Sequence, residues 1–295
     1  VAQRASRPGW RAAASRGGAA RRTLCTADLE ANPVLVEMSE DGRFATLTLN
    51  RPHVHNALND GIVRTIKSTL ERLRGAEHSG LRAVFLKASG GKTFCGGGDM
   101  KDFKNSALDP PAENHAKAVD FAAFLAEVNT FPRPVVAMVD GPAFGGGVGI
   151  ISVCDMAFST EKALFTLSEV KLGLIPATIS PYVVARIGEF HARRYFTTAE
   201  KFDAEEAKRI GLVHDVVADA DALEQREAEL RAAFAANSPA AMVAAKELVA
   251  TVVGRRTTPE LIEETAQALT DIRSSEEGIE GVCVCERERE RVCVC

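Results

Sequence analysis

Residues 135–149 read VVAMVDGPAFGGGVG, in which a short apolar run is followed by a turn and by three consecutive glycines. An apolar run of this length, bounded by proline and glycine, predicts a buried strand over residues 135–139. The apolar residues 148–153 then predict a helix. Glycine lets the chain adopt positive φ and lets a ligand approach the main chain, and the first N–H groups of a helix have no partner within it. This stretch therefore predicts a loop whose backbone N–H groups point at a ligand.

A second glycine run stands in the same context. Residues 93–99 read TFCGGGD and follow the apolar run 83–86, which predicts another buried strand. A single glycine run is more often only a turn, but two runs that each follow a strand favour backbone donors that converge on one carbonyl oxygen. The sequence therefore predicts an oxyanion hole.

The rest of the chain alternates strand and helix patterns before it becomes helical. Residues 45–49 alternate apolar and polar side chains, as a half-buried strand does. The apolar residues over 62–73 recur at helical spacing behind Asn59 or Asp60, either of which is a suitable N-cap. After about residue 179 the pattern predicts almost only helices. The other predicted helical ranges are 116–128, 204–210, 223–234 and 240–252. An α/β core with a helical C-terminal part follows.

Composition narrows the class of protein. The chain has 295 residues, 46% of them hydrophobic, which suffices for one large domain or two small ones. No stretch is long and apolar enough to span a membrane. Residues 1–27 hold six arginines and no acidic residue, the composition of an organelle transit peptide, so we expect the mitochondrial matrix. Without those six, 30 of the 36 basic residues remain against 40 acidic ones, which argues against nucleic-acid binding.

The cysteines and histidines give no clear metal site. Residues 282–295 read VCVCERERERVCVC, a low-complexity tail with four of the seven cysteines and no histidine beside them. Cys25, Cys95 and Cys154 are too few and too scattered for a disulfide framework. His53 and His55 lack an evident third ligand. We expect no metal.

Several motifs in fixed order resemble the crotonase (enoyl-CoA hydratase/isomerase) superfamily over roughly residues 33–281. Besides the two glycine runs, they are NRP at 50–52, HNAL at 55–58, CD at 154–155, SEVKLGLIP at 168–176 and AKRIGLV at 207–213. A chance match of so many motifs in the same order is very unlikely. The resemblance implies a spiral of ββα turns, followed by helices that form a homotrimer or a homohexamer. It divides the chain into a leader (1–27), a spiral core (28–190), a helical trimerisation region (191–281) and the tail (282–295).

The resemblance also implies the site. It places the two oxyanion donors on Gly96 and Gly146, and one catalytic carboxylate on Glu169. A carboxylate of suitable pKa can activate water and deliver a proton to a carbon. Coenzyme A would arrive as part of the acyl-CoA substrate, with no other cofactor. The further substrate-binding positions implied by the family are Gly97, Gly98, Asp99, His55 and Ala57.

The second glutamate of two-glutamate hydratases is missing, because its position is Gly149. Three interpretations stay open: a hydratase with one glutamate, a double-bond isomerase with a single base, or an acyl-CoA-binding protein without turnover. We expect the space beside Gly149 to admit substrate bulk or an ordered water.

The sequence around the site is similar to bacterial-type methylglutaconyl-CoA hydratases, which favours 3-methylglutaconyl-CoA of leucine breakdown as the substrate. The acid group of that substrate would need a cation. Candidates are Lys101, Lys104, Arg186 and Arg194.

Overall fold

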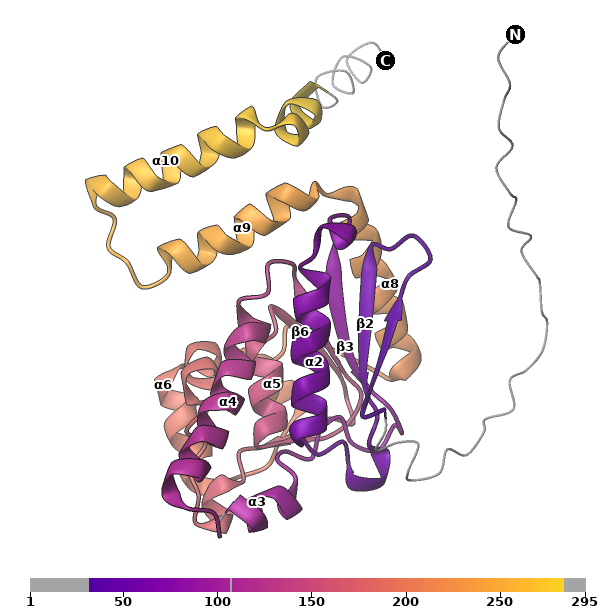
Figure 1. The fold of residues 1–295 in the computed structure, drawn as a ribbon, viewed down its shortest axis with the longest axis vertical. Helices are drawn as coiled ribbons and strands as arrows, with labels where there is room; N and C mark the ends of the chain where they lie inside the picture. The colour runs from indigo at the N-terminus through magenta and orange to yellow at the C-terminus, as the bar shows by residue number, and fades with distance from the viewer. Residues whose placement is uncertain (1–31, 107, 284–295) are drawn as a thin grey trace, which may run out of the picture.

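The computed structural model describes residues 32–106 and 108–283, and it centres on a six-stranded sheet in the order β1-β2-β3-β4-β6-β9 (Figure 1). The pair β1–β2 is antiparallel, and every later pair in this sheet is parallel. Parallel neighbours require helical crossovers, which explains the alternation in the sequence. The strands are β1 Val34–Met38, β2 Phe44–Leu49, β3 Ala83–Ala88, β4 Val135–Val139, β6 Met156–Thr160 and β9 Asp215–Val217.

Helices cover both faces of the sheet. On one face lie α2 (Asp60–Leu73), α4 (Pro111–Asn129) and α5 (Gly146–Val153), and on the other lies α8 (Ala220–Ala236). Along β3, Val84 packs in the larger core under the first group, and Phe85 packs in the smaller core under α8. Successive side chains of one strand thus pack into the cores on opposite faces of the sheet.

The predicted helix over 62–73 is confirmed as α2. Asn59 is its N-cap, because the Asn59 side chain accepts a hydrogen bond from the backbone N–H of Ile62 at 3.0 Å. The apolar residues at helical spacing, Ile62, Ile66 and Leu70, are all buried. Cap and periodicity therefore act together, as the sequence indicated.

A second, three-stranded sheet holds the second glycine run. It joins β5 (Ala143–Phe144), β7 (Leu164–Thr166) and β8 (Phe202–Asp203) in that order. The N–H of Gly145 donates to the carbonyl oxygen of Thr166 at 2.8 Å. This sheet fixes the chain immediately before α5.

The prediction of an almost wholly helical chain after residue 179 is wrong at two places, β8 and β9. β9 pairs with β6 and forms an edge of the main sheet. Strands of two and three residues are too short to show a period, and their hydrogen bonds come from distant partners. The other elements are α3 Met100–Ser106, α6 Ser180–Thr198, α7 Ala204–Arg209, α9 Pro239–Val252, α10 Pro259–Ser274, and the short 3₁₀ helices η1 Pro52–Val54, η2 Ala76–His78 and η3 Glu169–Leu172.

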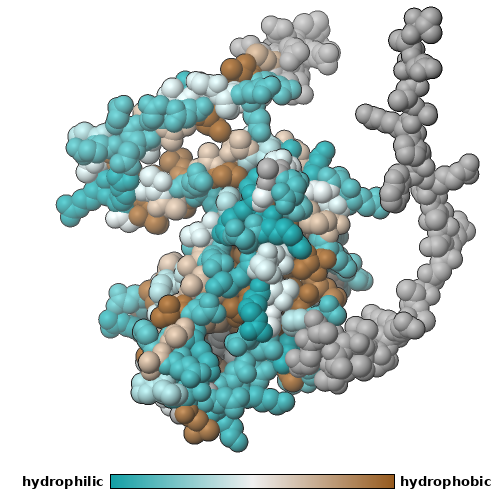
Figure 2. All heavy atoms as spheres, viewed as in Figure 1, coloured by the Kyte–Doolittle hydropathy of each residue, from teal (hydrophilic) through white to brown (hydrophobic). Residues whose placement is uncertain are grey.

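The last two long helices, α9 and α10, form a layer beside the main body (Figure 1). Figure 2 shows apolar side chains on them among polar ones. The exposed large apolar residues on these helices are Leu248, Val249, Val252, Ile262 and Leu269. A trimer or hexamer would cover such side chains, and that assembly stays a prediction.

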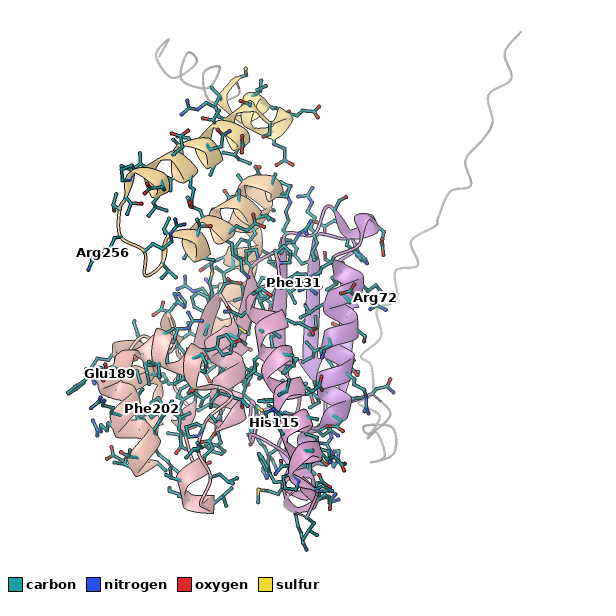
Figure 3. All side chains as sticks on the ribbon, turned by 60° about the vertical axis from the view of Figure 1, so that its left-hand side comes forward. Arg72, His115, Phe131, Glu189, Phe202 and Arg256 are labelled. Carbon is teal, nitrogen blue, oxygen red and sulfur yellow. The ribbon has the colours of Figure 1, made fainter. Side chains whose placement is uncertain are left out.

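The body separates charged from apolar side chains in the usual way. In Figure 3, Glu189 and Arg256 lie at the surface, whereas the rings of Phe131 and Phe202 are buried. No helix within residues 32–106 and 108–283 combines the length and apolar character needed to cross a membrane. The predicted leader and residues 284–295 of the predicted tail lie outside the described residues, and the predicted boundary at 190 falls within α6.

Candidate active site

The two glycine runs lie against each other, as the sequence predicted. The carbonyl oxygen of Cys95 accepts from the N–H of Phe144 at 2.9 Å, so the two loops are hydrogen-bonded side by side. A Cβ at Gly97 would lie 2.9 Å from the carbonyl oxygen of Phe144 and 3.7 Å from the nitrogen of Gly146. Gly97 also has a φ of 91°, so both its conformation and its surroundings require glycine.

The structure corrects one of the two predicted donors. The N–H of Gly96 donates to the carbonyl oxygen of His55 at 2.8 Å and is therefore already used. Among the described residues, the N–H of Gly98 has no such backbone acceptor. The carbonyl oxygen of Gly97 accepts from the N–H of Leu58, and the N–H of Asp99 donates to the carbonyl oxygen of Leu58. In a trans peptide the N–H points opposite to the preceding carbonyl, so the N–H of Gly98 points away from Leu58.

Gly98 and Gly146 are therefore the candidate donor pair. A Cβ at Gly146 would lie 3.7 Å from the nitrogen of Gly98, and both glycines are half-buried. Gly146 is the first residue of α5, where N–H groups have no partner within the helix. The geometry therefore favours Gly98 in place of Gly96, and it keeps the predicted Gly146.

Glu169 lies beside this pair. It opens η3, which follows β7 after Leu167 and Ser168. Its Oε1 would be 2.9 Å from a Cβ at Gly145, the residue before Gly146. Its Oε2 is buried and has no hydrogen-bond partner within the described residues. Burial raises the pKa of the Glu169 carboxyl above its ordinary value. A partly desolvated carboxyl of raised pKa next to backbone donors is suited to proton transfer.

The space expected beside Gly149 does not exist. A Cβ at Gly149 would lie 2.2 Å from Cγ2 of Ile179 and 2.8 Å from its Cβ. Ile179 is only 2% exposed, and its carbonyl oxygen accepts from the N–H groups of Tyr182 and Val183 at the start of α6. An isoleucine fixed at a helix start thus fills the place of the absent side chain, and neither a second carboxylate nor a water fits there.

We expect Gly149→Ala to destabilise the protein by about 1 to 3 kcal/mol, because the new methyl group overpacks the contact with Ile179. Ile179→Ala alone should cost about 2 to 5 kcal/mol, since it leaves a cavity. The double variant should lose clearly less than the sum of the two single losses. Urea unfolding of all four proteins measures this, and strictly additive losses would contradict the contact.

The remaining predicted binding residues support the loop through their own polar groups. The carboxylate of Asp99 pairs with Arg51 at 2.9 Å and accepts from the N–H of Lys101 at 3.0 Å. Burial would raise the pKa of Asp99, but these two hydrogen bonds outweigh it and the pKa is lowered. The carbonyl oxygens of His55 and Ala57 accept bonds from Gly96 and Arg51. The structure brings these residues together at the glycine loop.

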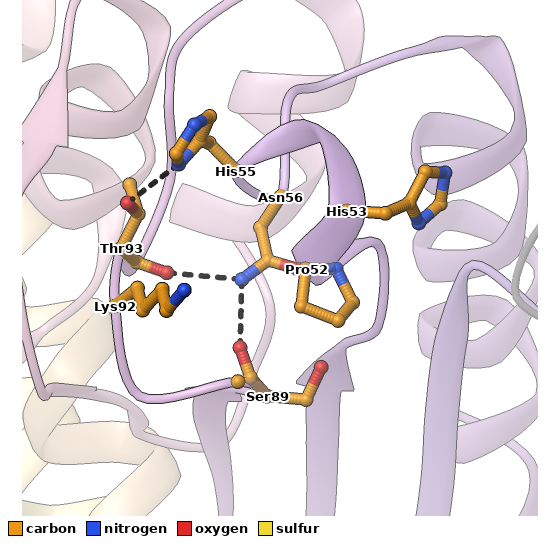
Figure 4. Close-up of a pocket in the computed structure, with 8 residues that line it drawn as sticks. Pro52, His53, His55, Asn56, Ser89, Lys92 and Thr93 are labelled. Carbon is orange, nitrogen blue, oxygen red and sulfur yellow. Dashed lines mark hydrogen bonds between the residues drawn. The ribbon is translucent and has the colours of Figure 1, made fainter. Parts of the chain in front are cut away.

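A pocket of about 260 Å³ lies beside this loop (Figure 4). The Asn56 side chain donates to the carbonyl oxygens of Ser89 and Thr93, both at 3.0 Å, and Nδ1 of His55 lies 3.0 Å from Oγ1 of Thr93. The lining residues are Pro52, His53, His55, Asn56, Ser89, Gly90, Lys92 and Thr93. Glu169 and the donor glycines are not among them, so the pocket is separate from the carboxylate. Sequence reasoning missed Ser89 and Lys92, which precede the glycine run.

Two of the four candidate cations are used elsewhere. The guanidinium of Arg186 donates to the carbonyl oxygens of Ile151, Cys154 and Asp155 at the end of α5. Arg194 pairs with Glu200.

The other two candidate cations, Lys101 and Lys104, are exposed on α3. Within residues 32–106 and 108–283, no three His, Cys, Asp or Glu side chains are grouped to hold a metal ion.

This fold is that of the crotonase class. Residues 40–290 match the family described as enoyl-CoA hydratase/isomerase, and the chain belongs to that family. It is 36% identical to YngF of Bacillus subtilis over 204 residues, which are 69% of this chain and 76% of YngF. It is 29% identical to the short-chain-enoyl-CoA hydratase of Clostridium acetobutylicum over 222 residues, 75% of this chain and 82% of that enzyme.

Comparison with solved structures supports the same family assignment. An enoyl-CoA hydratase from Shewanella pealeana superposes with a TM-score of 0.81 at 33% identity, covering 90% of this chain and 98% of that one. AtuE of Pseudomonas aeruginosa superposes with a TM-score of 0.82 at 35% identity, covering 87% of this chain and 97% of AtuE. The predicted crotonase fold is confirmed.

Proposed function

We propose that this chain is an enoyl-CoA hydratase that adds water across the 2,3 double bond of an enoyl-CoA thioester. Attack of water at C3 moves negative charge onto the thioester oxygen, and the free N–H groups of Gly98 and Gly146 are suited to receive it. The observation that carries the proposal is the buried, unpartnered Oε2 of Glu169 beside this donor pair.

Glu169 would carry the proton. As a carboxylate it takes a proton from water while the hydroxyl group bonds to C3, and it then delivers that proton to C2 of the enolate. The raised pKa of Glu169 brings it closer to neutral pH, which suits a group that alternates between base and acid. The reaction is neither an oxidation nor a reduction, so it needs no redox cofactor, and coenzyme A enters with the substrate.

The pocket beside the glycine loop is where we place the adenine end of coenzyme A. Lys92 and His53 line it and can face phosphate oxygens. For the acyl group we propose 3-methylglutaconyl-CoA, whose terminal carboxylate would meet Lys101 or Lys104 on α3. A place in leucine breakdown in the mitochondrial matrix, and a homotrimer or homohexamer, belong to this proposal. The arginine-rich residues 1–27 and the exposed apolar residues of α9 and α10 support them.

One observation favours an alternative, a double-bond isomerase. Moving a double bond from C3 to C2 needs one base that shuttles one proton, and Ile179 leaves no room for a second carboxylate at Gly149. Such an enzyme would use the same oxyanion donors.

Incubation in ¹⁸O-water tests the proposal. The full chain is given 3-methylglutaconyl-CoA, crotonyl-CoA and a 3-enoyl-CoA, and the products are measured by mass spectrometry. We expect ¹⁸O in a 3-hydroxyacyl product, with the 3-methyl substrate processed fastest. A 2-enoyl product from the 3-enoyl substrate, with no ¹⁸O in any product, would establish the isomerase instead. Unchanged thioesters that nevertheless bind would indicate an acyl-CoA-binding protein.

A further inference from the structure

The loop that carries the donor Gly98 is held on its C-terminal side by a buried ion pair. Nη1 of Arg51 lies 2.9 Å from Oδ2 of Asp99, and the two side chains are only 5% and 11% exposed. The same nitrogen donates to the carbonyl oxygen of Ala57 at 2.8 Å. Arg51 follows β2, so one guanidinium ties the end of a core strand to both segments of the site.

Asp99 is fixed from three directions. Its Oδ2 accepts from Arg51, its Oδ1 accepts from the N–H of Lys101, and its own N–H donates to the carbonyl oxygen of Leu58 at 2.8 Å. Asp99 directly follows Gly98 in the chain. The peptide group that carries the Gly98 N–H is therefore one residue away from a rigidly held side chain.

Stability alone does not account for this pair. Removing two charges from water costs free energy that their attraction often fails to recover, and apolar residues of the same volume are commonly as stable. An oxyanion donor, in contrast, must be placed within a few tenths of an ångström. A run of three glycines cannot supply that accuracy, because glycine is the most flexible residue. The residues on either side of the run must supply it.

We propose that Arg51 and Asp99 are positioning residues that aim the N–H of Gly98 at the thioester oxygen. The Gly96–His55 hydrogen bond holds the loop before Gly98, and the ion pair holds it after. This inference rests on the proposed function, because the aimed N–H acts on an enoyl thioester.

The double variant Arg51→Met/Asp99→Asn tests it without leaving an unpaired buried charge. Asn keeps an oxygen for the N–H of Lys101, so the start of α3 stays capped. We expect kcat to fall about 10- to 100-fold with KM nearly unchanged, as for a misplaced catalytic group. Arg51→Lys, which keeps the charge, should retain most of the activity. We also expect faster hydrogen–deuterium exchange in the segment 93–99.

A matched control is the ion pair of Lys246 on α9 with Asp155, the residue before β6, at 2.7 Å. The Asp155 carboxylate also accepts from the N–H of Val135 at the start of β4, away from the glycine loops. Lys246→Met/Asp155→Asn should leave kcat within about twofold of wild type and leave hydrogen–deuterium exchange over 93–99 unchanged. A folded Arg51→Met/Asp99→Asn protein with wild-type kcat and wild-type exchange over 93–99 would overturn the inference. Failure of the proposed function gives a different result, because the wild type itself would then turn over no enoyl thioester. In that case hydrogen–deuterium exchange over 93–99 would decide whether the Arg51–Asp99 pair orders the loop.

Discussion

Glu169→Gln is expected to reduce kcat by about 10²- to 10⁴-fold, the usual effect of a positioned acid or base. Glutamine has nearly the same shape as glutamate but cannot take a proton from water. Binding of the CoA thioester should change little, because Glu169 lies beside Gly145 and not in the pocket that contains Lys92. Initial rates and isothermal titration with a product CoA thioester measure the two effects separately.

Glu161→Gln is a suitable control, because Glu161 is exposed in the turn after β6. It should retain wild-type kcat. Activity of Glu169→Gln within about tenfold of wild type would remove Glu169 from the mechanism.

The same variant has a second expected effect, on stability. Burial raises the pKa of Glu169 in the folded protein, so ionisation of this carboxyl favours the unfolded chain. The folded protein is most stable with respect to this group when Glu169 is protonated. That stability is fully present below the pKa of the unfolded chain and is lost as pH rises through the raised pKa of the folded protein. Glu169→Gln should therefore melt at a higher temperature than wild type at pH 7.5, and this gain should shrink towards pH 4. Thermal melts at both pH values measure it, and a lower melting temperature at pH 7.5 would contradict the cost of burying Glu169.

The sequence could predict what depends on neighbours along the chain. The strand 135–139 and the α2 helix with its Asn59 cap follow from local patterns that the structure confirms. The approach of the two glycine runs, a contact between distant segments, was predicted from their matching strand-to-loop context and is also confirmed. Glu169 was singled out by its motif, and the structure places it beside Gly145.

What the sequence could not predict depends on contacts between distant segments. The choice of Gly98 over Gly96 follows from which N–H meets the carbonyl oxygen of His55, about forty residues earlier in the chain. The filled space at Gly149 depends on Ile179, the N-cap residue of another helix, α6. The buried partner of Asp99 is Arg51. In the sequence, Arg51 stands out only as part of the NRP motif, which does not indicate this ion pair. Each of these differences comes from a tertiary contact, which the periodicity of the local sequence does not indicate.

Gly146→Pro removes one of the two proposed donors. Proline has no N–H, and the first position of a helix tolerates it, so α5 should still form. Loss of one oxyanion donor typically lowers kcat about 10²- to 10³-fold, or roughly 2.7 to 4 kcal/mol of transition-state stabilisation. We expect a loss of that size, and circular dichroism should show an unchanged helix content.

Gly146→Ala is the matched control, because alanine keeps the N–H. Its Cβ would lie 3.2 Å from Cδ1 of Leu58, the end of a flexible side chain that can shift slightly. Gly147 would be unsuitable, since a Cβ there would lie 2.7 Å from the carbonyl oxygen of Cys95. If Gly146→Pro and Gly146→Ala are both folded and equally active, the N–H of Gly146 does not stabilise the oxyanion. A large loss in the proline variant alone would show that the reaction depends on the N–H of this residue and not on the absence of a β-carbon.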